Sequence, residues 1–220
     1  MPYILLAAVL PGLFWIWYFQ RRDPYDREPW PMLLKAGVFG AAAVIPAIAF
    51  EYPFRSFLQG EVGWLTAFWV SFGVVGLGEE LVKLTAVYAA AYSSEHFNEP
   101  VDGIIYAVTA GIGFSVVENV LYISSFGLSI APLRAVVASL AHASFSGIAG
   151  YYLGRAKYAP QPWGELALGL FWAAVLHGIY DFLLITQLVS PLWIVVGVGV
   201  FHYILLRLID RQLPKARIRP

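Results

Sequence analysis

Two adjacent glutamates and a lysine stand inside an apolar run from Trp64 to Tyr92, in the stretch Gly76-Leu77-Gly78-Glu79-Glu80-Leu81-Val82-Lys83. An apolar segment of this length is typical of a membrane-spanning helix. One Lys or Asp at the centre of such a helix costs roughly 2.5 to 3.5 kcal/mol on insertion scales, so three uncompensated charges would make it a poor membrane helix. The rest of the chain must therefore supply polar partners at a similar depth, and it offers Glu118, His142, His177 and Asp181.

The composition places the whole chain in the membrane. Of its 220 residues, 60% are hydrophobic and only 13% are charged, which is far too apolar for a soluble domain of this size. The net charge is zero and the basic residues stand at segment ends, so no nucleic-acid partner is expected. Cysteine is absent, which leaves carboxylate, imidazole, hydroxyl and amine groups to carry any chemistry.

Seven apolar segments are separated by short polar links. They predict an all-α, polytopic membrane helix bundle that forms a single integral-membrane domain over residues 1–220, in a multi-pass protein of the cell membrane. The first segment lacks a basic start and a small-residue cleavage site, so it is expected to be a retained anchor. The predicted spans are Tyr3 to Phe19, Met32 to Phe50, Trp64 to Tyr92, Val101 to Phe126, Ala131 to Leu153, Glu165 to Leu188 and Pro191 to Ile209.

The basic residues predict the orientation of the bundle. Seven spans put the two termini on opposite sides, and with the N-terminus outside, the outer segments hold only Arg55 and Arg134. We therefore expect an N-out, C-in topology, with the polar cluster between mid-membrane and the outer face. The inner segments then hold the other eleven basic residues of the links and tail, namely Arg21, Arg22, Arg27, Lys35, Arg155, Lys157, Arg207, Arg211, Lys215, Arg217 and Arg219.

Each polar residue of the cluster continues a stripe of small side chains at helical spacing. Such a stripe is how one membrane helix packs closely against another, so the ionisable groups are expected to point into the bundle. The four stripes are Gly73, Gly76, Glu80 and Lys83; Gly103, Ala107, Gly111, Ser115 and Glu118; Ala138, His142, Ser146 and Gly150; and Gly169, Ala173, His177 and Asp181.

Two pairs of these residues share a helix face. His177 and Asp181 are four residues apart, so the carboxylate can orient the imidazole or both can bind one ion. Glu79 and Lys83 have the same spacing. That pair would hold the lysine charge and leave Glu80, about 100° around the helix, to face the cavity.

Several peptidase chemistries lack their residues in this chain. There is no His-Glu-x-x-His zinc motif, and an aspartyl dyad would need a second membrane aspartate to act with Asp181. A dyad of Ser144 or Ser146 with a histidine would leave the paired glutamates without a role. Glutamate-driven activation of water remains, with imidazole and a second acid polarising the carbonyl and protonating the leaving amine.

Three other interpretations stay open at this point. Buried polar groups can form a purely structural network that fixes helix register, or can relay protons or cations in a membrane transporter. A transporter is expected to show inverted repeats, whereas the charges here are concentrated in the third to sixth spans. A non-catalytic membrane scaffold would bind substrate peptides without cleaving them.

Four motifs on successive spans resemble those of the PrsW intramembrane proteases: Glu79-Glu80-x-x-Lys83, Phe114-x-x-x-Glu118-Asn119, His142 before Phe145-Ser146-Gly147, and His177-x-x-x-Asp181. The PrsW family is similar in turn to the CAAX prenyl protease and bacteriocin-immunity (ABI) superfamily. CAAX proteases typically carry an arginine at the place of Lys83 and a histidine at the place of Glu118, which argues against isoprenyl-protein processing here.

The resemblance implies an endopeptidase that takes part in regulated proteolysis and cuts a membrane-anchored protein near the outer membrane face. In PrsW the implied substrate is an anti-sigma factor, and the partners are that substrate and the lipid bilayer. The family is often grouped with metalloproteases, so a divalent metal such as zinc is a candidate cofactor, with Glu80, Glu118, His142 and His177 as candidate ligands. The expected catalytic residues are Glu79, Glu80, Lys83, Glu118, His142, His177 and Asp181.

Overall fold

The computed structural model describes residues 2–58 and 62–216, and every regular element within these ranges is helical. The first half of the chain holds α1 (Pro2–Gln20), α2 (Trp30–Ala42), α3 (Val44–Glu51), η1 (Tyr52–Leu58), α4 (Trp64–Trp69), η2 (Val70–Gly76), α5 (Leu77–Val87) and η3 (Tyr88–Tyr92). The second half holds α6 (Pro100–Phe126), η4 (Leu128–Ile130), α7 (Ala131–Leu133), η5 (Arg134–Ala138), α8 (Ser139–Ala156), α9 (Pro162–Thr186) and α10 (Pro191–Ala216).

These elements join into seven helical segments that are long and apolar enough to cross a membrane, which confirms the predicted number of spans. The second segment runs from Trp30 to Phe57, past its predicted end at Phe50. The prediction stopped early because Glu51 marked the end of the apolar run, yet the Glu51 side chain is half-buried against the bundle. A polar residue that faces inward does not end a membrane helix.

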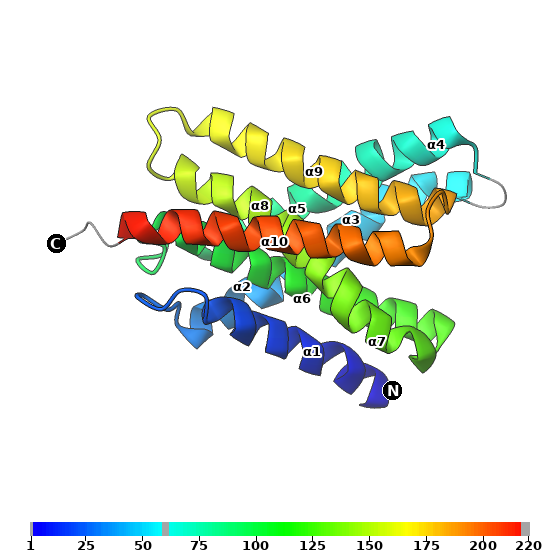
Figure 1. Cartoon of the computed structure of the whole chain (residues 1–220), viewed down its shortest axis with the longest axis horizontal. Helices are drawn as coiled ribbons and strands as arrows, with labels where there is room; N and C mark the ends of the chain where they lie inside the picture. The colour runs from blue at the N-terminus through cyan, green and yellow to red at the C-terminus, as the bar shows by residue number, and fades with distance from the viewer. Residues whose placement is uncertain (1, 59–61, 217–220) are drawn as a thin grey trace.

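Helix α1 begins and helix α10 ends at opposite ends of the bundle (Figure 1). This is the arrangement that an odd number of spans requires, although the direction across the membrane stays a prediction. Of the basic tail that carries this prediction, Arg217 and Arg219 lie outside the described residues.

Helix α6 is the core of the bundle and packs against α8, α2 and α1. Its contact with α8 depends on glycine: a Cβ at Gly103 would lie 2.4 Å from the Gly150 carbonyl oxygen, and one at Gly154 would overlap the Pro100 carbonyl. Lipid tails are as apolar as the helices, so such close backbone approach supplies much of the packing energy in a membrane. The glycine stripes on these two helices therefore form an interface, as the sequence predicts.

The outer surface of the bundle is apolar. Large aliphatic side chains such as Leu65, which is 82% exposed, and Ile45 point away from the other helices. A continuous apolar exterior around a polar interior is the arrangement that a lipid environment requires. The chain is therefore a multi-pass membrane protein.

The third span is wider than a regular helix just before its glutamates, because η2 is a π-helical turn. The wider turn shifts the residue phase, so Ser71 and Val74 are buried there whereas Gly73 is exposed. The prediction that Gly73 belongs to the packing stripe is therefore wrong, since it assumed 3.6 residues per turn throughout. Gly76 does face the bundle, and a Cβ there would lie 2.7 Å from the Ala174 carbonyl oxygen of α9.

Candidate active site

Four helices bring all seven predicted site residues into one connected cluster inside the bundle. The packing of η2 and α5 against α9, and of α6 against α8, carries these residues toward one another. Helix α5 supplies Glu79, Glu80 and Lys83, α6 supplies Glu118, α8 supplies His142, and α9 supplies His177 and Asp181.

Lys83 links the two glutamates of its own helix. Its ammonium donates to Glu79 Oε2 at 2.8 Å and to Glu80 Oε1 at 2.9 Å, and only 1% of the residue is exposed. The expectation that Lys83 holds Glu79 alone and leaves Glu80 facing a cavity is wrong, because a flexible lysine reaches carboxylates three and four positions earlier at once. Glu80 has no exposed surface.

The contacts of His142 define which ring nitrogen carries its proton. Nδ1 lies 2.9 Å from the Lys83 ammonium, which can only donate, so Nδ1 is the acceptor. Nε2 then carries the hydrogen and donates it to Glu118 Oε2 at 2.8 Å. The imidazole is thereby held between a cation on one side and a carboxylate on the other.

His177 lies among three carboxylates. Its Nδ1 is 2.9 Å from Glu80 Oε1, while its Nε2 is 3.3 Å from Asp181 Oδ2 and 3.8 Å from Glu79 Oε2. The Phe145 ring stacks on the imidazole at 5.1 Å between centroids and limits its rotation. The expected contact between His177 and Asp181, one helical turn apart, is therefore present.

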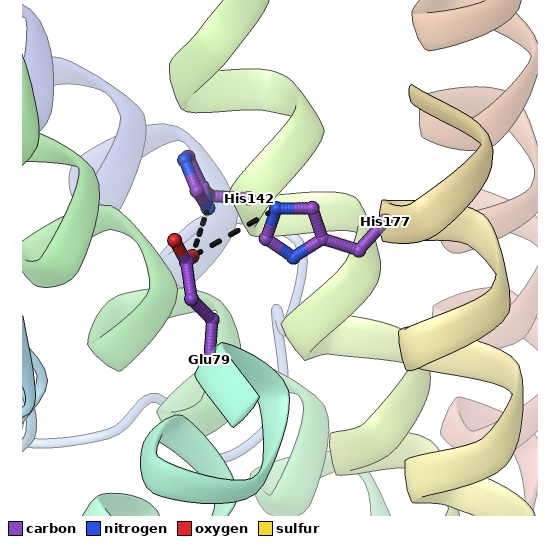
Figure 2. Close-up of side chains that lie close together, drawn as sticks. All are labelled: Glu79, His142 and His177. Atoms are coloured by element: carbon purple, nitrogen blue, oxygen red, sulfur yellow. Dashed lines mark ion pairs between the residues drawn. The ribbon is translucent and has the colours of Figure 1, made fainter. Parts of the chain in front are cut away.

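Glu79, His142 and His177 form a buried group that could hold a metal ion, with one ligand atom from each lying within 4.8 Å of the other two. Figure 2 shows the three side chains pointing toward one another from three different helices. Ligands about 2.0 to 2.2 Å from a tetrahedral zinc ion are about 3.3 to 3.6 Å apart. The separations here are 4.0 Å from Glu79 to His142 and 3.8 Å to His177, so small side-chain movements suffice.

The remaining contacts of the two histidines also fit a metal site. A ligating histidine usually donates its other ring N–H to a carboxylate, which fixes the ring and its tautomer. Glu118 is in that position for His142, and Glu80 is in that position for His177. Glu80 and Glu118 were expected as ligands themselves, whereas the structure places them at the far side of the rings and puts Glu79 between the rings.

Lys83 contacts Glu79 Oε2 and His142 Nδ1, two atoms of the same triad. A cation bound by the triad would meet the lysine charge at close range, so the Lys83 side chain must turn away from these atoms when the site is loaded. Glu80 can retain it, since the 2.9 Å contact to Glu80 Oε1 lies outside the triad.

Two charged residues of the site were missed as functional groups by sequence reasoning. Arg134 donates to Glu118 Oε2 at 2.9 Å and to Asn119 Oδ1 at 2.7 Å, although the sequence used it only as a topology marker. Glu51 interacts electrostatically with the site carboxylates, and its buried Oε1 accepts no hydrogen bond among the described residues. The available signal was the position of Arg134 inside a predicted span and of Glu51 directly after one.

The balance of charge favours a bound cation. The carboxylates Glu79, Glu80, Glu118 and Asp181 outnumber the two permanently charged bases, Lys83 and Arg134. Buried excess charge of one sign is costly, and a divalent ion offsets it. The donor set of two imidazole nitrogens and one carboxylate oxygen is one that zinc accepts.

Comparisons with known proteins show the family of this chain. The model of a family described as PrsW family intramembrane metalloprotease matches residues 28–208. Among curated proteins, Protease PrsW of Geobacillus kaustophilus is 35% identical over 189 residues, covering 84% of this chain and 80% of that protein. Protease PrsW of Bacillus subtilis is 35% identical over 185 residues, covering 82% of each chain, and that of Clostridioides difficile is 34% identical over 194 residues, covering 84% and 80%. No solved structure matches.

Proposed function

Because this chain belongs to the PrsW family of intramembrane metalloproteases, it is a membrane-embedded peptide hydrolase, and we propose that Glu79, His142 and His177 hold its metal. The observation that carries this proposal is the pair of carboxylate-supported imidazoles facing one glutamate. His142 would offer Nδ1 and His177 would offer Nε2, because Glu118 and Glu80 occupy the other nitrogens.

Glu79, His142 and His177 would hold a divalent metal such as zinc, which would polarise the scissile carbonyl and make a nearby water molecule more acidic. Asp181 is the residue placed to take the proton of the attacking water. Its side chain is 18% exposed, and its buried Oδ2 lies 3.3 Å from His177 Nε2 without a hydrogen bond among the described residues, so the carboxylate lies at the edge of the cluster beside a proposed ligand. After the attack, the same carboxylic acid returns the proton to the leaving amine.

Arg134 supplies a fixed positive charge near the reacting group. Glu118 and Asn119 hold its guanidinium at 2.9 Å and 2.7 Å, so the group is already oriented before a substrate arrives. A preorganised cation stabilises the negative charge that develops on the carbonyl oxygen during hydrolysis. Arg134 thereby joins the site through the same carboxylate that orients His142.

The substrate class follows from the position of the cluster. Asp181 lies near the end of α9 with 18% of its side chain exposed, and the large exposed side chains of the bundle surface are apolar. A membrane-anchored protein, such as an anti-sigma factor, would therefore present its peptide bond from within the bilayer. The distribution of basic residues in the sequence supports cleavage near the outer membrane face. The glutamate pair and the His-x-x-x-Asp motif support a wider relationship to CAAX proteases.

The test uses the purified full-length chain in proteoliposomes with candidate single-span membrane proteins, with and without chelator. Cleavage that stops with chelator and returns with zinc supports the metal assignment. Full activity in protein shown to be metal-free by elemental analysis would contradict it and leave glutamate-driven water activation. Ion or proton uptake without any cleavage would instead support a transporter.

The orientation is tested separately with reporters fused to the C-terminus. A reporter active only on the cytoplasmic side supports the N-out, C-in topology. A reporter active only outside would move the cluster, and the proposed cut, to the inner half of the membrane.

A further inference from the structure

One buried hydroxyl beside the active site has no role in the proposed hydrolysis. Ser146 lies on α8, four residues after His142, and only 2% of it is exposed. Its Oγ donates a hydrogen bond to Glu80 Oε2 on α5 at 3.1 Å. Within the described part of the chain this hydroxyl is the only donor to Glu80 Oε2, because Lys83 and His177 both contact Oε1.

This hydrogen bond runs between two helices instead of within one. A serine on a helix often donates to the carbonyl four residues earlier, as Ser144 does to Leu140 at 2.7 Å. Ser146 instead donates to another helix, and α6 lies close against it, since a Cβ at Gly111 would be 2.7 Å from its Oγ. The hydroxyl is thereby enclosed by neighbouring helices and directed at one carboxylate oxygen.

The other oxygen of Glu80 has two tasks, so its position matters. Oε1 lies 2.9 Å from His177 Nδ1 and orients the ring that would offer Nε2 to the metal. It also lies 2.9 Å from the Lys83 ammonium, which it must retain when the triad is loaded. A glutamate carboxylate turns easily about its last bond, because this torsion has broad energy wells. A donor on Oε2 therefore keeps Oε1 directed at both partners.

We infer that Ser146 is a positioning residue for peptide hydrolysis: it fixes the Glu80 carboxylate, which in turn orients His177 and holds Lys83. The inference rests on the proposed metal triad, and it gives Ser146 no contact with substrate or metal. Without the hydroxyl, Glu80 Oε2 would be a buried acceptor without a partner, which favours rotation of the carboxylate. A nucleophilic serine would instead need a histidine base, and no hydrogen bond joins Ser146 to a histidine among the described residues.

The experiment compares Ser146→Ala with Ser144→Ala in the full-length protein in proteoliposomes. Each change removes one buried hydroxyl from α8, but Ser144 donates within its own helix, so Ser144→Ala is the matched control and should cleave at the wild-type rate. We expect Ser146→Ala to lower kcat by about 5- to 10-fold with little change in KM, the size expected for one lost hydrogen bond. Ser146→Cys keeps the size with a much weaker donor and replaces Ser146→Ala if that variant does not fold.

Two further measurements show whether Ser146 acts through Glu80. The double variant Ser146→Ala/Glu80→Gln should lose little activity beyond Glu80→Gln alone. In protein loaded with Co²⁺, the visible absorption bands report the geometry of the metal ligands. Ser146→Ala should shift these bands, whereas Ser144→Ala should leave them unchanged.

Equal losses of kcat in Ser146→Ala and Ser144→Ala, or losses that multiply in the double variant, would overturn the inference. A loss of more than about 10³-fold, with labelling of Ser146 by a serine-reactive phosphonate, would make this residue the nucleophile instead. Glu79→Gln separates the inference from the metal assignment. Co²⁺ bands that survive in Glu79→Gln would contradict the triad, while the comparison of kcat values would still decide the role of Ser146.

Discussion

The two ends of α6 carry polar clusters that solve the problem of buried charge in different ways. At the Glu118 end, acids alternate with Lys83, Arg134 and two histidines, and most polar atoms have a partner. At the Asp102 end, the side chains are almost all acidic and Asp23 Oδ2 has no donor among the described residues. Mixed signs offset part of the buried charge at the Glu118 end and leave an excess of carboxylates that suits a divalent cation, whereas at the Asp102 end backbone amides donate to the Asp23 and Asp102 carboxylates.

This difference separates two uses of buried carboxylates. In the first cluster each carboxylate has its own orienting task, so the loss of one is expected to change chemistry more than folding. In the second cluster the carboxylates brace loop and helix, so the loss of one is expected to change stability more than chemistry. The following variants test that division, beginning with the largest expected effect.

Glu79→Gln removes the charged member of the metal triad while keeping the size of the side chain. We expect cleavage to fall by more than about 10³-fold, beyond the 10- to 100-fold typical of residues that only support a ligand. Metal content should fall in parallel, measured by elemental analysis of the purified variant. Glu165→Gln is the control, because Glu165 forms an exposed ion pair with Arg155, and this variant should cleave substrate normally. Normal cleavage by Glu79→Gln would remove the triad from the mechanism.

Asp181→Asn removes the proposed proton acceptor, and we expect turnover to fall by about 10²-fold or more. His177→Ala should cost more, since it removes a ligand as well. Because the aspartate acts beside this histidine, the double variant should lose little beyond His177→Ala alone. Single-turnover cleavage rates of the three variants measure this, and losses that multiply would show that the two residues act independently.

Glu80→Gln and Glu118→Gln each leave a histidine without its orienting carboxylate. We expect activity and metal affinity to fall by about 10- to 100-fold, because the ring and its tautomer are no longer fixed. Competition with a chelator of known affinity gives the metal affinity. A loss as severe as that of Glu79→Gln would mean that the affected glutamate binds the metal itself.

Glu28→Gln tests the acidic end of α6 through pH. Burial and the Asp102 carboxylate raise the pKa of Glu28 well above its ordinary value of 4.5. The folded state therefore binds the proton more tightly than the unfolded state, so this group's contribution to stability is fully present below pH 4.5 and is lost as pH rises toward the folded pKa.

Wild-type stability should thus fall between pH 5 and 8 by up to about 1.4 kcal/mol per pH unit from this group. Glu28→Gln should show a flatter profile of unfolding midpoint against pH. Parallel profiles for the two proteins would show that Glu28 titrates alike in the folded and unfolded states.

The sequence predicted the seven spans and the gathering of its charged residues because both follow from one rule. An apolar run long enough to cross the bilayer must be helical, and a charge within it must face another helix. The rule identified Glu118, His142 and His177 from separate helices. It worked because the small-residue stripes on α6 and α8 mark the packed face directly.

What the sequence did not predict depends on three-dimensional detail. The phase change at η2 exposes Gly73, and no sequence period announces a π-helical turn. That Glu79 lies near both imidazole rings while Glu80 contacts the far nitrogen of His177 depends on how the helices place the side chains. Asp23, Glu99 and Asp102 went unnoticed because acids in a loop and at a helix start are ordinary there, and only the fold brings them together.

The position of Lys83 in the chain has a consequence for biosynthesis. His142 follows Lys83 by 59 positions and His177 follows Glu80 by 97, so the ribosome completes the third span well before either histidine exists. During that interval Lys83 is the partner that the nascent helix itself supplies to Glu79 and Glu80. The segment can therefore leave the translocon with one net negative charge in place of three separate charges, and its carboxylates are already aligned when the later helices insert.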